Sequence, residues 1–282
     1  MGMLNTVLML LAVPQAQAAP PTTPTTPTTP TAPAAPAAPA GDARRLDQVA
    51  WLGRMLYTFD RAAWVSTDAL LAKVSKDKLA GVGGYVVEPG EGEVLHVTYY
   101  MGTGDAARAF FVADVRGGKV TASTMLAAPT PLTPAQAMLA RARDVAAKAA
   151  VERGYKPCTS APFNTVVLPL GKDGPTAVYL LTPQKDAQHY PIGGHFRVVV
   201  GPDGAVLAKR PYSVSCLSVP LAKLPKGAAP VALTVNYLLE PTPSELHVFA
   251  SYNLGLPLVV ATSDNSVWQV AGSRITKVPP AK

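Results

Sequence analysis

Residues 133–154, TPAQAMLARARDVAAKAAVERG, decide the fold because they contain the start and the end of a helix. Thr133 is a typical N-cap residue, and the Pro that follows it suits the first helical position. Gln136 stands where a capping box requires it. Gly154 is typical of the left-handed residue that ends a helix. The segment therefore predicts an α-helix over about 134–153.

The segments on both sides of this helix alternate between apolar and polar residues with a period of two, which is typical of β-strands. Two turns favour antiparallel pairing: Gly117-Gly118 suits a two-residue hairpin, and Pro202-Asp203-Gly204 suits a hairpin of similar length. The predicted strands cover residues 85–88, 94–101, 107–115 and 120–126 before the helix, and 164–168, 177–182, 196–200, 206–209, 231–237, 245–251, 258–261, 267–270 and 275–278 after it.

Another amphipathic helix is predicted over about 42–63, where apolar residues recur at spacings of three and four. A separate short helical stretch is predicted over 68–74, after a cap at Ser66 or Thr67. Five aromatic residues are expected to pack in the core or against a sheet: Tyr99, Tyr100, Trp51, Trp64 and Trp268.

The order of a helix followed by strands thus occurs twice. It predicts an α+β fold of antiparallel β-meanders with two main helices, at about 42–63 and 134–153. The two parts, residues 42–130 and 131–282, are predicted either as two layers or as one continuous domain.

The first 18 residues resemble a secretory signal peptide. The apolar run 7–13 is followed by Pro14 and by Ala16-Gln17-Ala18, which predicts cleavage after Ala18. This run is far shorter than the roughly 20 apolar residues that a membrane span needs. Residues 1–6 contain no Lys or Arg, so the basic segment typical of such signals is missing. We expect a periplasmic or secreted protein with no transmembrane span.

Residues 19–41 form a linker rich in Thr, Pro and Ala, in which Pro-Thr-Thr and then Pro-Ala-Ala repeat. Such a composition buries no apolar surface and is typical of disordered, extended chain. Two interpretations stay open: a spacer that holds the folded part away from an envelope surface, and a tail without a role.

Cys158 and Cys216 are the two cysteines of the chain. An even number of cysteines in an exported protein favours one disulfide bond. The alternative is a catalytic thiol, but Cys158 follows a predicted helix C-terminus, where the helix dipole disfavours a thiolate. We therefore predict the Cys158–Cys216 disulfide.

The formal net charge is +7, which favours anionic partners. Period-two alternation places His195 and Arg197 on one face of a predicted hairpin, and Lys209 or Arg210 opposite them on the returning strand. These four residues are the predicted binding site for a carboxylate, a phosphate or a glycan acid, with Arg197 as a fork-shaped donor. The alternative is a solvated outer face without a ligand.

Three histidines support a second hypothesis. His189, His195 and His247 are candidates for a small periplasmic hydrolase or a metal-dependent enzyme, with Glu245 on the same face of the strand predicted over 245–251. The sequence contains no G-x-S-x-G, H-E-x-x-H or P-loop motif. The run GTGDAA at 102–107 is interpreted as a hairpin turn rather than a dinucleotide site, and no cofactor is expected.

Taken together, these patterns favour a non-catalytic exported protein, acting as a binding or envelope-associated module. The expected partner is an anionic envelope component or a small anionic ligand, and no nucleic acid is expected. A third possibility is a structural or assembly protein, for which a large exposed apolar patch would be expected.

Overall fold

In a computed structural model of the chain, residues 40–221 and 230–280 are described. The predicted signal peptide, 1–18, lies outside the described residues, as does nearly all of the predicted linker, 19–41.

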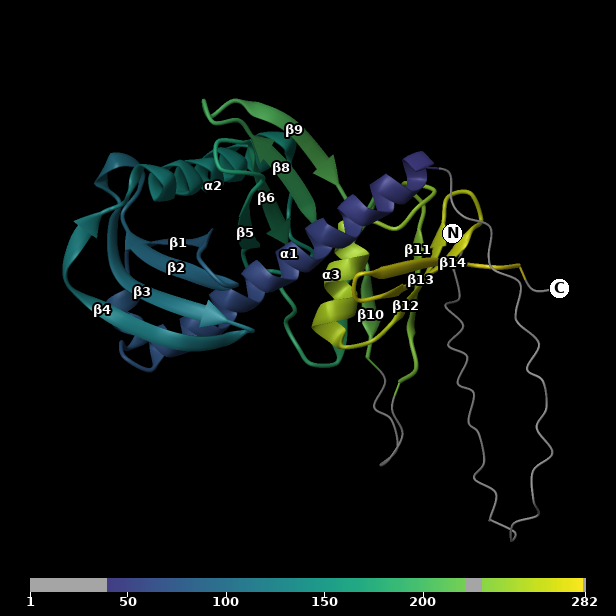
Figure 1. Cartoon of the computed structure of the whole chain (residues 1–282), viewed down its shortest axis with the longest axis horizontal. Helices are drawn as coiled ribbons and strands as arrows, with labels where there is room; N and C mark the ends of the chain where they lie inside the picture. The colour runs from purple at the N-terminus through teal and green to yellow at the C-terminus, as the bar shows by residue number, and fades with distance from the viewer. Residues whose placement is uncertain (1–39, 222–229, 281–282) are drawn as a thin grey trace, which may run out of the picture. The chain divides into compact units, whose positions relative to one another are not determined.

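The described residues form three helices and four sheets, and the predicted α+β class with its helix-then-strands order is confirmed (Figure 1). The helices are α1 (Ala40–Leu71), α2 (Pro134–Arg153) and α3 (Glu245–Leu254), with short 3-10 helices at η1 (Lys76–Leu79) and η2 (Gly104–Ala106).

Two four-stranded antiparallel sheets follow α1 and α2 respectively. The first contains β1 (Val82–Pro89), β2 (Val94–Met101), β3 (Arg108–Arg116) and β4 (Lys119–Pro131) in that order. The second contains β5 (Asn164–Pro169), β6 (Thr176–Leu181), β8 (Phe196–Val200) and β9 (Val206–Pro211) in that order.

A small pair joins β7 (His189–Pro191) to β10 (Ser218–Pro220). The last sheet contains β11 (Leu233–Tyr237), β12 (Leu258–Thr262), β13 (Val267–Ala271) and β14 (Arg274–Val278). Its β11 and β12 are parallel, because α3 connects them, so this sheet departs from the antiparallel meander that the sequence predicted.

The α2 helix has the bounds and the caps that the sequence predicted. Thr133 accepts a hydrogen bond from the backbone N–H of Gln136, and the Gln136 side chain accepts one from the N–H of Thr133. Gly154 ends the helix with φ at 73°. The turn between β3 and β4 also has the predicted form, since Gly117 and Gly118 have φ values of 56° and 72°.

The α1 helix is longer than predicted. The expected break at Ser66 and Thr67 is absent, because both hydroxyls bond back to backbone oxygens one turn earlier and the helix continues to Leu71. The Ser66 and Thr67 hydroxyls also contact the hydroxyl of Tyr99 on β2, which fixes this end of α1 against the first sheet.

Residues 245–251 form the start of α3, and the strand predicted there is wrong. Each of these seven residues is buried, so the segment has no exposed face and its apolar residues show no helical period. The helix begins after Ser244 and ends at Gly255, whose φ is 63°.

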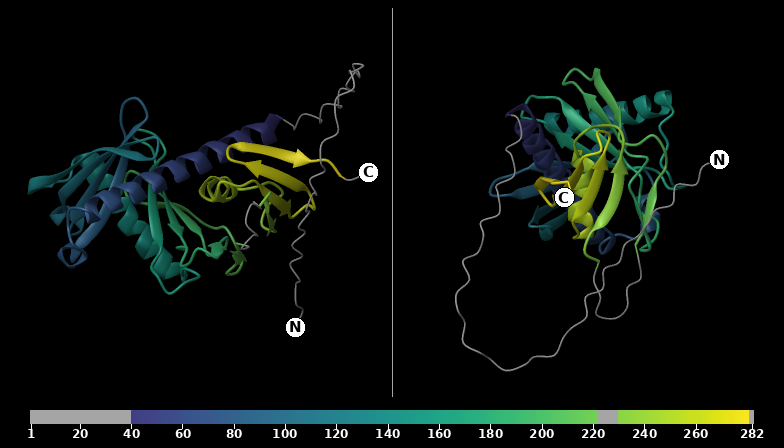
Figure 2. Two further views of the ribbon diagram at one scale, coloured as in Figure 1. Left: turned by 90° about the horizontal axis from the view of Figure 1, so that it is seen from below. Right: turned by 90° about the vertical axis from the view of Figure 1, so that its right-hand side faces the viewer.

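The α1 helix packs against the first sheet, against β5 and against α3, and Figure 2 shows it running past all of these elements. One core cluster contains Phe59 of α1, Phe111 of β3, Tyr179 of β6 and Phe249 of α3. Side chains from both predicted halves of the chain therefore share one core. At Gly53, where α1 and α3 cross, an added Cβ would lie 2.6 Å from the carbonyl oxygen of Glu245, so the close approach requires glycine.

Candidate functional site

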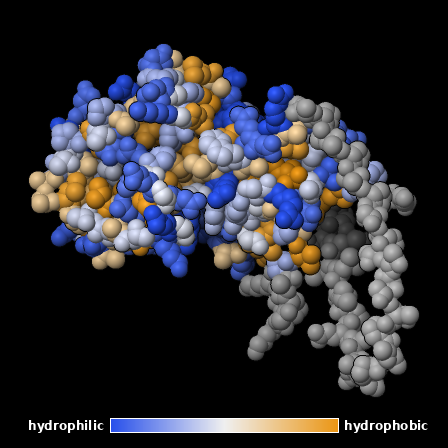
Figure 3. Space-filling model, viewed as in Figure 1, coloured by the Kyte–Doolittle hydropathy of each residue, from blue (hydrophilic) through white to orange (hydrophobic). Residues whose placement is uncertain are grey.

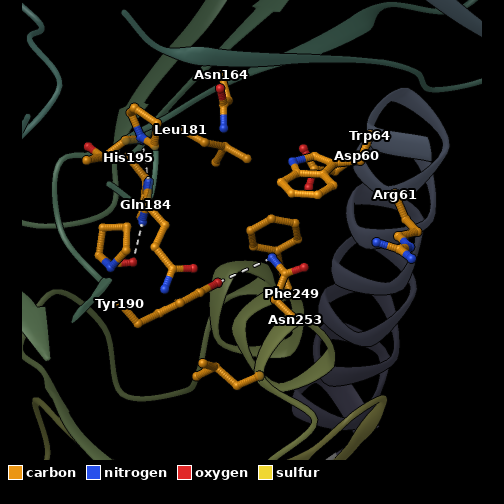
Figure 4. Close-up of a pocket in the computed structure, with 14 residues that line it drawn as sticks. Asp60, Arg61, Trp64, Asn164, Leu181, Gln184, Tyr190, His195, Phe249 and Asn253 are labelled. Atoms are coloured by element: carbon orange, nitrogen blue, oxygen red, sulfur yellow. Dashed lines mark hydrogen bonds between the residues drawn. The ribbon is translucent and has the colours of Figure 1, made fainter. Parts of the chain in front are cut away.

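A pocket of about 440 Å³ lies between α1, α3 and the segment that joins β6 to β7 (Figure 4). We call it the α1–α3 pocket. Its lining residues come from α1 (Asp60, Arg61, Trp64), from the start of β5 (Asn164), from residues 181–184 and 190–191 with His195, and from α3 (Phe249, Asn253, Leu254).

The lining of the pocket is mixed, with about as much polar as apolar surface. Leu181, Tyr190 and Phe249 are buried in the wall, whereas Asn164 and Asn253 are exposed at the rim. Trp64 lines the pocket with 60% of its surface exposed. The prediction that Trp51 and Trp64 lie in the core is wrong, since Trp51 is also 50% exposed.

Asp60 is the acidic residue among the described residues that line the pocket. Burial raises the pKa of its carboxyl from 3.8 to about 6, and the nearby Arg61 guanidinium opposes part of this rise. No side chain or backbone group among the described residues forms a hydrogen bond or an ion pair with the Asp60 carboxylate.

Tyr190 and Asn253 are joined by a hydrogen bond at the pocket. The amide nitrogen of Asn253 donates to the Tyr190 hydroxyl oxygen at 3.3 Å, and Figure 4 shows this contact. The Asn253 carbonyl oxygen and the Tyr190 hydroxyl proton are left available to a ligand. Burial raises the pKa of Tyr190 well above its usual value, so the hydroxyl is neutral.

His195 belongs to the pocket wall but is held by the protein itself. Its Nδ1 accepts a hydrogen bond from the Thr182 backbone N–H at 3.0 Å, and its Nε2 donates to the Pro191 carbonyl oxygen at 3.1 Å. Burial lowers the pKa of this imidazole to about 4, so it is neutral at pH 7. Both nitrogens of His195 are therefore engaged by the segment between Thr182 and Pro191. The imidazole orients this segment rather than offering a ligand atom.

The Cys158–Cys216 pair also contacts this segment, at Thr182. The Cα atoms are 5.4 Å apart and the two residues form a disulfide. The Cys158 N–H donates to the Thr182 hydroxyl, which in turn donates to the Gly194 carbonyl oxygen at 2.7 Å. Gly194 has φ at 72°, and an added Cβ there would strike the Cys158 sulfur, so glycine is required beside the disulfide.

Arg197 and Arg210 are opposite each other in the β8–β9 pairing, whereas Lys209 is opposite Val198. Directly paired residues share a face, so the structure brings the two arginines together and places Lys209 on the other face of the sheet. His195 is buried in the pocket wall. The four predicted site residues therefore do not form one cluster.

Both arginines are already paired with carboxylates. Arg197 donates to Glu245 at 2.6 Å, and Arg210 donates to Glu240 at 2.8 Å. Arg210 also lies 3.8 Å from Glu245, and Arg45 of α1 pairs with Glu240 at 2.5 Å. We call this set of five residues the Glu245 ion-pair network. Its carboxylates compete with any anion for the two guanidinium groups.

Neither His189 nor His247 belongs to a metal-binding cluster of described residues. His189 is exposed and contacts Asp186, while the Nδ1 of His247 accepts a hydrogen bond from the Ser244 backbone N–H. Burial lowers the pKa of His247 to about 4. Within residues 40–221 and 230–280, no three His, Cys, Asp or Glu side chains gather closely enough to hold a metal ion.

Sequence reasoning missed the pocket residues Asp60, Trp64, Asn164 and Asn253. Asp60 and Trp64 lie one helical turn apart on α1, and this spacing was the available signal that they share a face of the helix. The lining residues outside α1 come from segments more than 90 residues away. Among the described residues, no helix is both long enough and apolar enough to cross a membrane.

No protein-family model matches the chain, and searches of curated proteins and of solved structures find no similar protein.

Proposed function

We propose that this chain is an exported, non-catalytic binding protein that holds a small ligand in the α1–α3 pocket. The observation that carries the proposal is the set of polar groups without protein partners at a cavity that also has exposed and buried aromatic rings in its lining. The Asp60 carboxylate and the Asn164 amide lie at the same pocket as the exposed ring of Trp64. Small-molecule sites combine apolar surface with polar groups that orient the ligand, both of which this pocket has, and about 440 Å³ lies within their usual range.

Export is supported by the disulfide and by the signal-like sequence at residues 1–18. A disulfide persists in an oxidising compartment, and the Cys158–Cys216 bond braces the pocket loop. In this account residues 19–41 act as a spacer between the folded part and an envelope surface. N-terminal sequencing of the exported chain tests this part, with Ala19 expected as the first residue.

An anionic partner at the β8–β9 hairpin has weaker support, since the Glu245 ion-pair network occupies Arg197 and Arg210. On the face drawn in Figure 3, apolar groups are separated by hydrophilic ones.

The three tryptophans allow a direct test of the pocket. With 5-fluorotryptophan incorporated, Trp51, Trp64 and Trp268 give three ¹⁹F NMR signals, which single Trp→Phe variants assign. We expect pocket ligands in a panel of cationic, neutral and anionic small molecules to shift the Trp64 signal and to leave Trp51 and Trp268 unchanged. A panel in which no compound moves Trp64 selectively contradicts the proposal.

A further inference from the structure

Two charged side chains line the α1–α3 pocket, those of Asp60 and Arg61, and of these Asp60 is the one that points toward the cavity (Figure 4). The carboxylate lies at a lining of mixed polar and apolar residues, and no described residue neutralises it by a hydrogen bond or an ion pair. Asp60 is partly buried, and a charge that is partly removed from water without a partner is costly. Carboxyls with a raised pKa in a cleft are candidates for functional sites.

The charged and titratable groups around Asp60 do not supply that partner. Arg61 lowers the Asp60 pKa, but its side chain rests on the β3–β4 turn, with Cγ 3.3 Å from where a Cβ at Gly118 would lie. In Figure 4, Arg61 runs along α1, while Asp60 and Trp64 point toward the cavity. Tyr85 and Tyr190 interact with Asp60, and burial raises the pKa of both hydroxyls, so they are neutral. His195 is neutral as well.

Aromatic rings stand beside this carboxylate. Trp64 and Phe249 both line the pocket, one exposed and one buried (Figure 4). The face of an indole ring attracts cations, and a quaternary or protonated amine is the ligand class for which an aromatic wall with a carboxylate is suited. The amide oxygens of Asn164 and Asn253 are further acceptors for N–H donors.

Resting on the proposed function, we propose that the ligand of the α1–α3 pocket is an organic cation, an amine that carries an apolar group. Its ammonium pairs with Asp60 and stacks on Trp64, and its apolar group fills the space along Leu181 and Phe249. An amine neutralises the Asp60 carboxylate, which has no ion pair among the described residues, whereas a neutral alcohol or a sugar supplies hydrogen bonds without neutralising it.

The test compares three probes of one size: phenethylamine, 2-phenylethanol and phenylacetate. Binding to the full-length exported chain is followed by the ¹⁹F signal of Trp64 at pH 7.5. We expect phenethylamine to bind at least about tenfold more tightly than 2-phenylethanol, and phenylacetate to bind least. Asp60→Asn removes the preference for the amine. Asp47→Asn, an exposed acid on the same helix, is the matched control and retains it.

The pH dependence gives a second readout. Because the Asp60 carboxyl has a pKa of about 6, its charge is mostly lost at pH 5. The affinity for phenethylamine is expected to fall about tenfold between pH 7.5 and pH 5, with no such fall for 2-phenylethanol.

The experiment distinguishes failure of the cationic-ligand inference from failure of the proposed function. If 2-phenylethanol or a methyl glycoside shifts Trp64 at concentrations equal to or lower than phenethylamine, the inference of a cationic ligand is wrong and the binding pocket stands. If neither these probes nor a wider neutral and anionic panel moves the Trp64 signal, the proposed function is wrong as well.

Discussion

Arg197 on β8 donates a hydrogen bond to the buried carboxylate of Glu245 on α3, with 2.6 Å between Nη1 and Oε1. The hydroxyls of Tyr179 and Tyr212 donate to the same oxygen. Glu245 occupies the first turn of α3, where the helix dipole also favours a negative charge. These contacts join the second sheet to the helix that forms one wall of the pocket.

Glu245→Gln is expected to lower the free energy of unfolding by about 3 kcal/mol, because it leaves Arg197 half-buried without a counter-ion. Urea unfolding measures the change. The matched control is Glu240→Gln, whose carboxylate is 26% exposed and whose loss is expected to cost below about 1 kcal/mol. Equal effects of the two variants would contradict the structural role of the Glu245 pair.

Asp60→Asn is expected to stabilise the free protein at pH 7 by on the order of 1–2 kcal/mol, allowing for solvent screening. The folded-state pKa is raised from 3.8 to about 6, so ionisation of Asp60 costs stability as the pH rises through this window. The gain should be small by pH 4 and should vanish at still lower pH, where the carboxyl is protonated in both states. Thermal unfolding at pH 7 and pH 4 measures it, and destabilisation at pH 7 would show that Asp60 has a protein partner.

The stability contributed by His195 and His247 is expected to depend on pH in the opposite sense to that of Asp60. Burial lowers the pKa of each from 6.5 to about 4, so the stability that each contributes is present above pH 6.5 and is lost as the pH falls toward 4. Each shift corresponds to at most about 3 kcal/mol. NMR of the two imidazoles should show no protonation between pH 7 and pH 5. Titration of either ring near pH 6.5 would disprove the burial argument.

The double variant Cys158→Ser/Cys216→Ser is expected to lose about 4 kcal/mol of stability, as the chain-entropy model gives for a bond that joins residues 58 apart. Because Cys158 contacts Thr182, the variant should also weaken ligand binding at temperatures where it remains folded. Urea unfolding and the Trp64 signal measure the two effects. A stability loss without any effect on binding would separate the disulfide from the pocket.

The sequence predicted the fold best where local signals are strong. The caps at Thr133 and Gly154 located α2, and the glycines at 117 and 118 located a hairpin. Prediction was wrong at α3, because a helix buried on every side shows no period of 3.6. Its flanking signals, Ser244 and Gly255, were present and indicate a helix.

The candidate site was less predictable, because contact partners far apart in sequence decide it. The alternation around Arg197 correctly placed it beside Arg210 or Lys209, and Arg210 is its partner in the register. Nothing in that alternation revealed that Glu245 would neutralise the pair, because Glu245 was assigned to a strand. Asp60 and Trp64 belong to a candidate site because α3 and the residues after β6 line the same pocket as α1.

The most direct test of the account compares two exposed tryptophans on α1. Calorimetric titration of any ligand that moves the Trp64 signal is repeated with Trp64→Ala and with Trp51→Ala, since both side chains are at least half exposed and Trp64 alone of the two lines the pocket. The account predicts that Trp64→Ala weakens binding at least about tenfold, as loss of one aromatic contact does, and that Trp51→Ala leaves the affinity unchanged. Equal affinities of the two variants, or a larger loss with Trp51→Ala, would contradict a ligand site in the α1–α3 pocket.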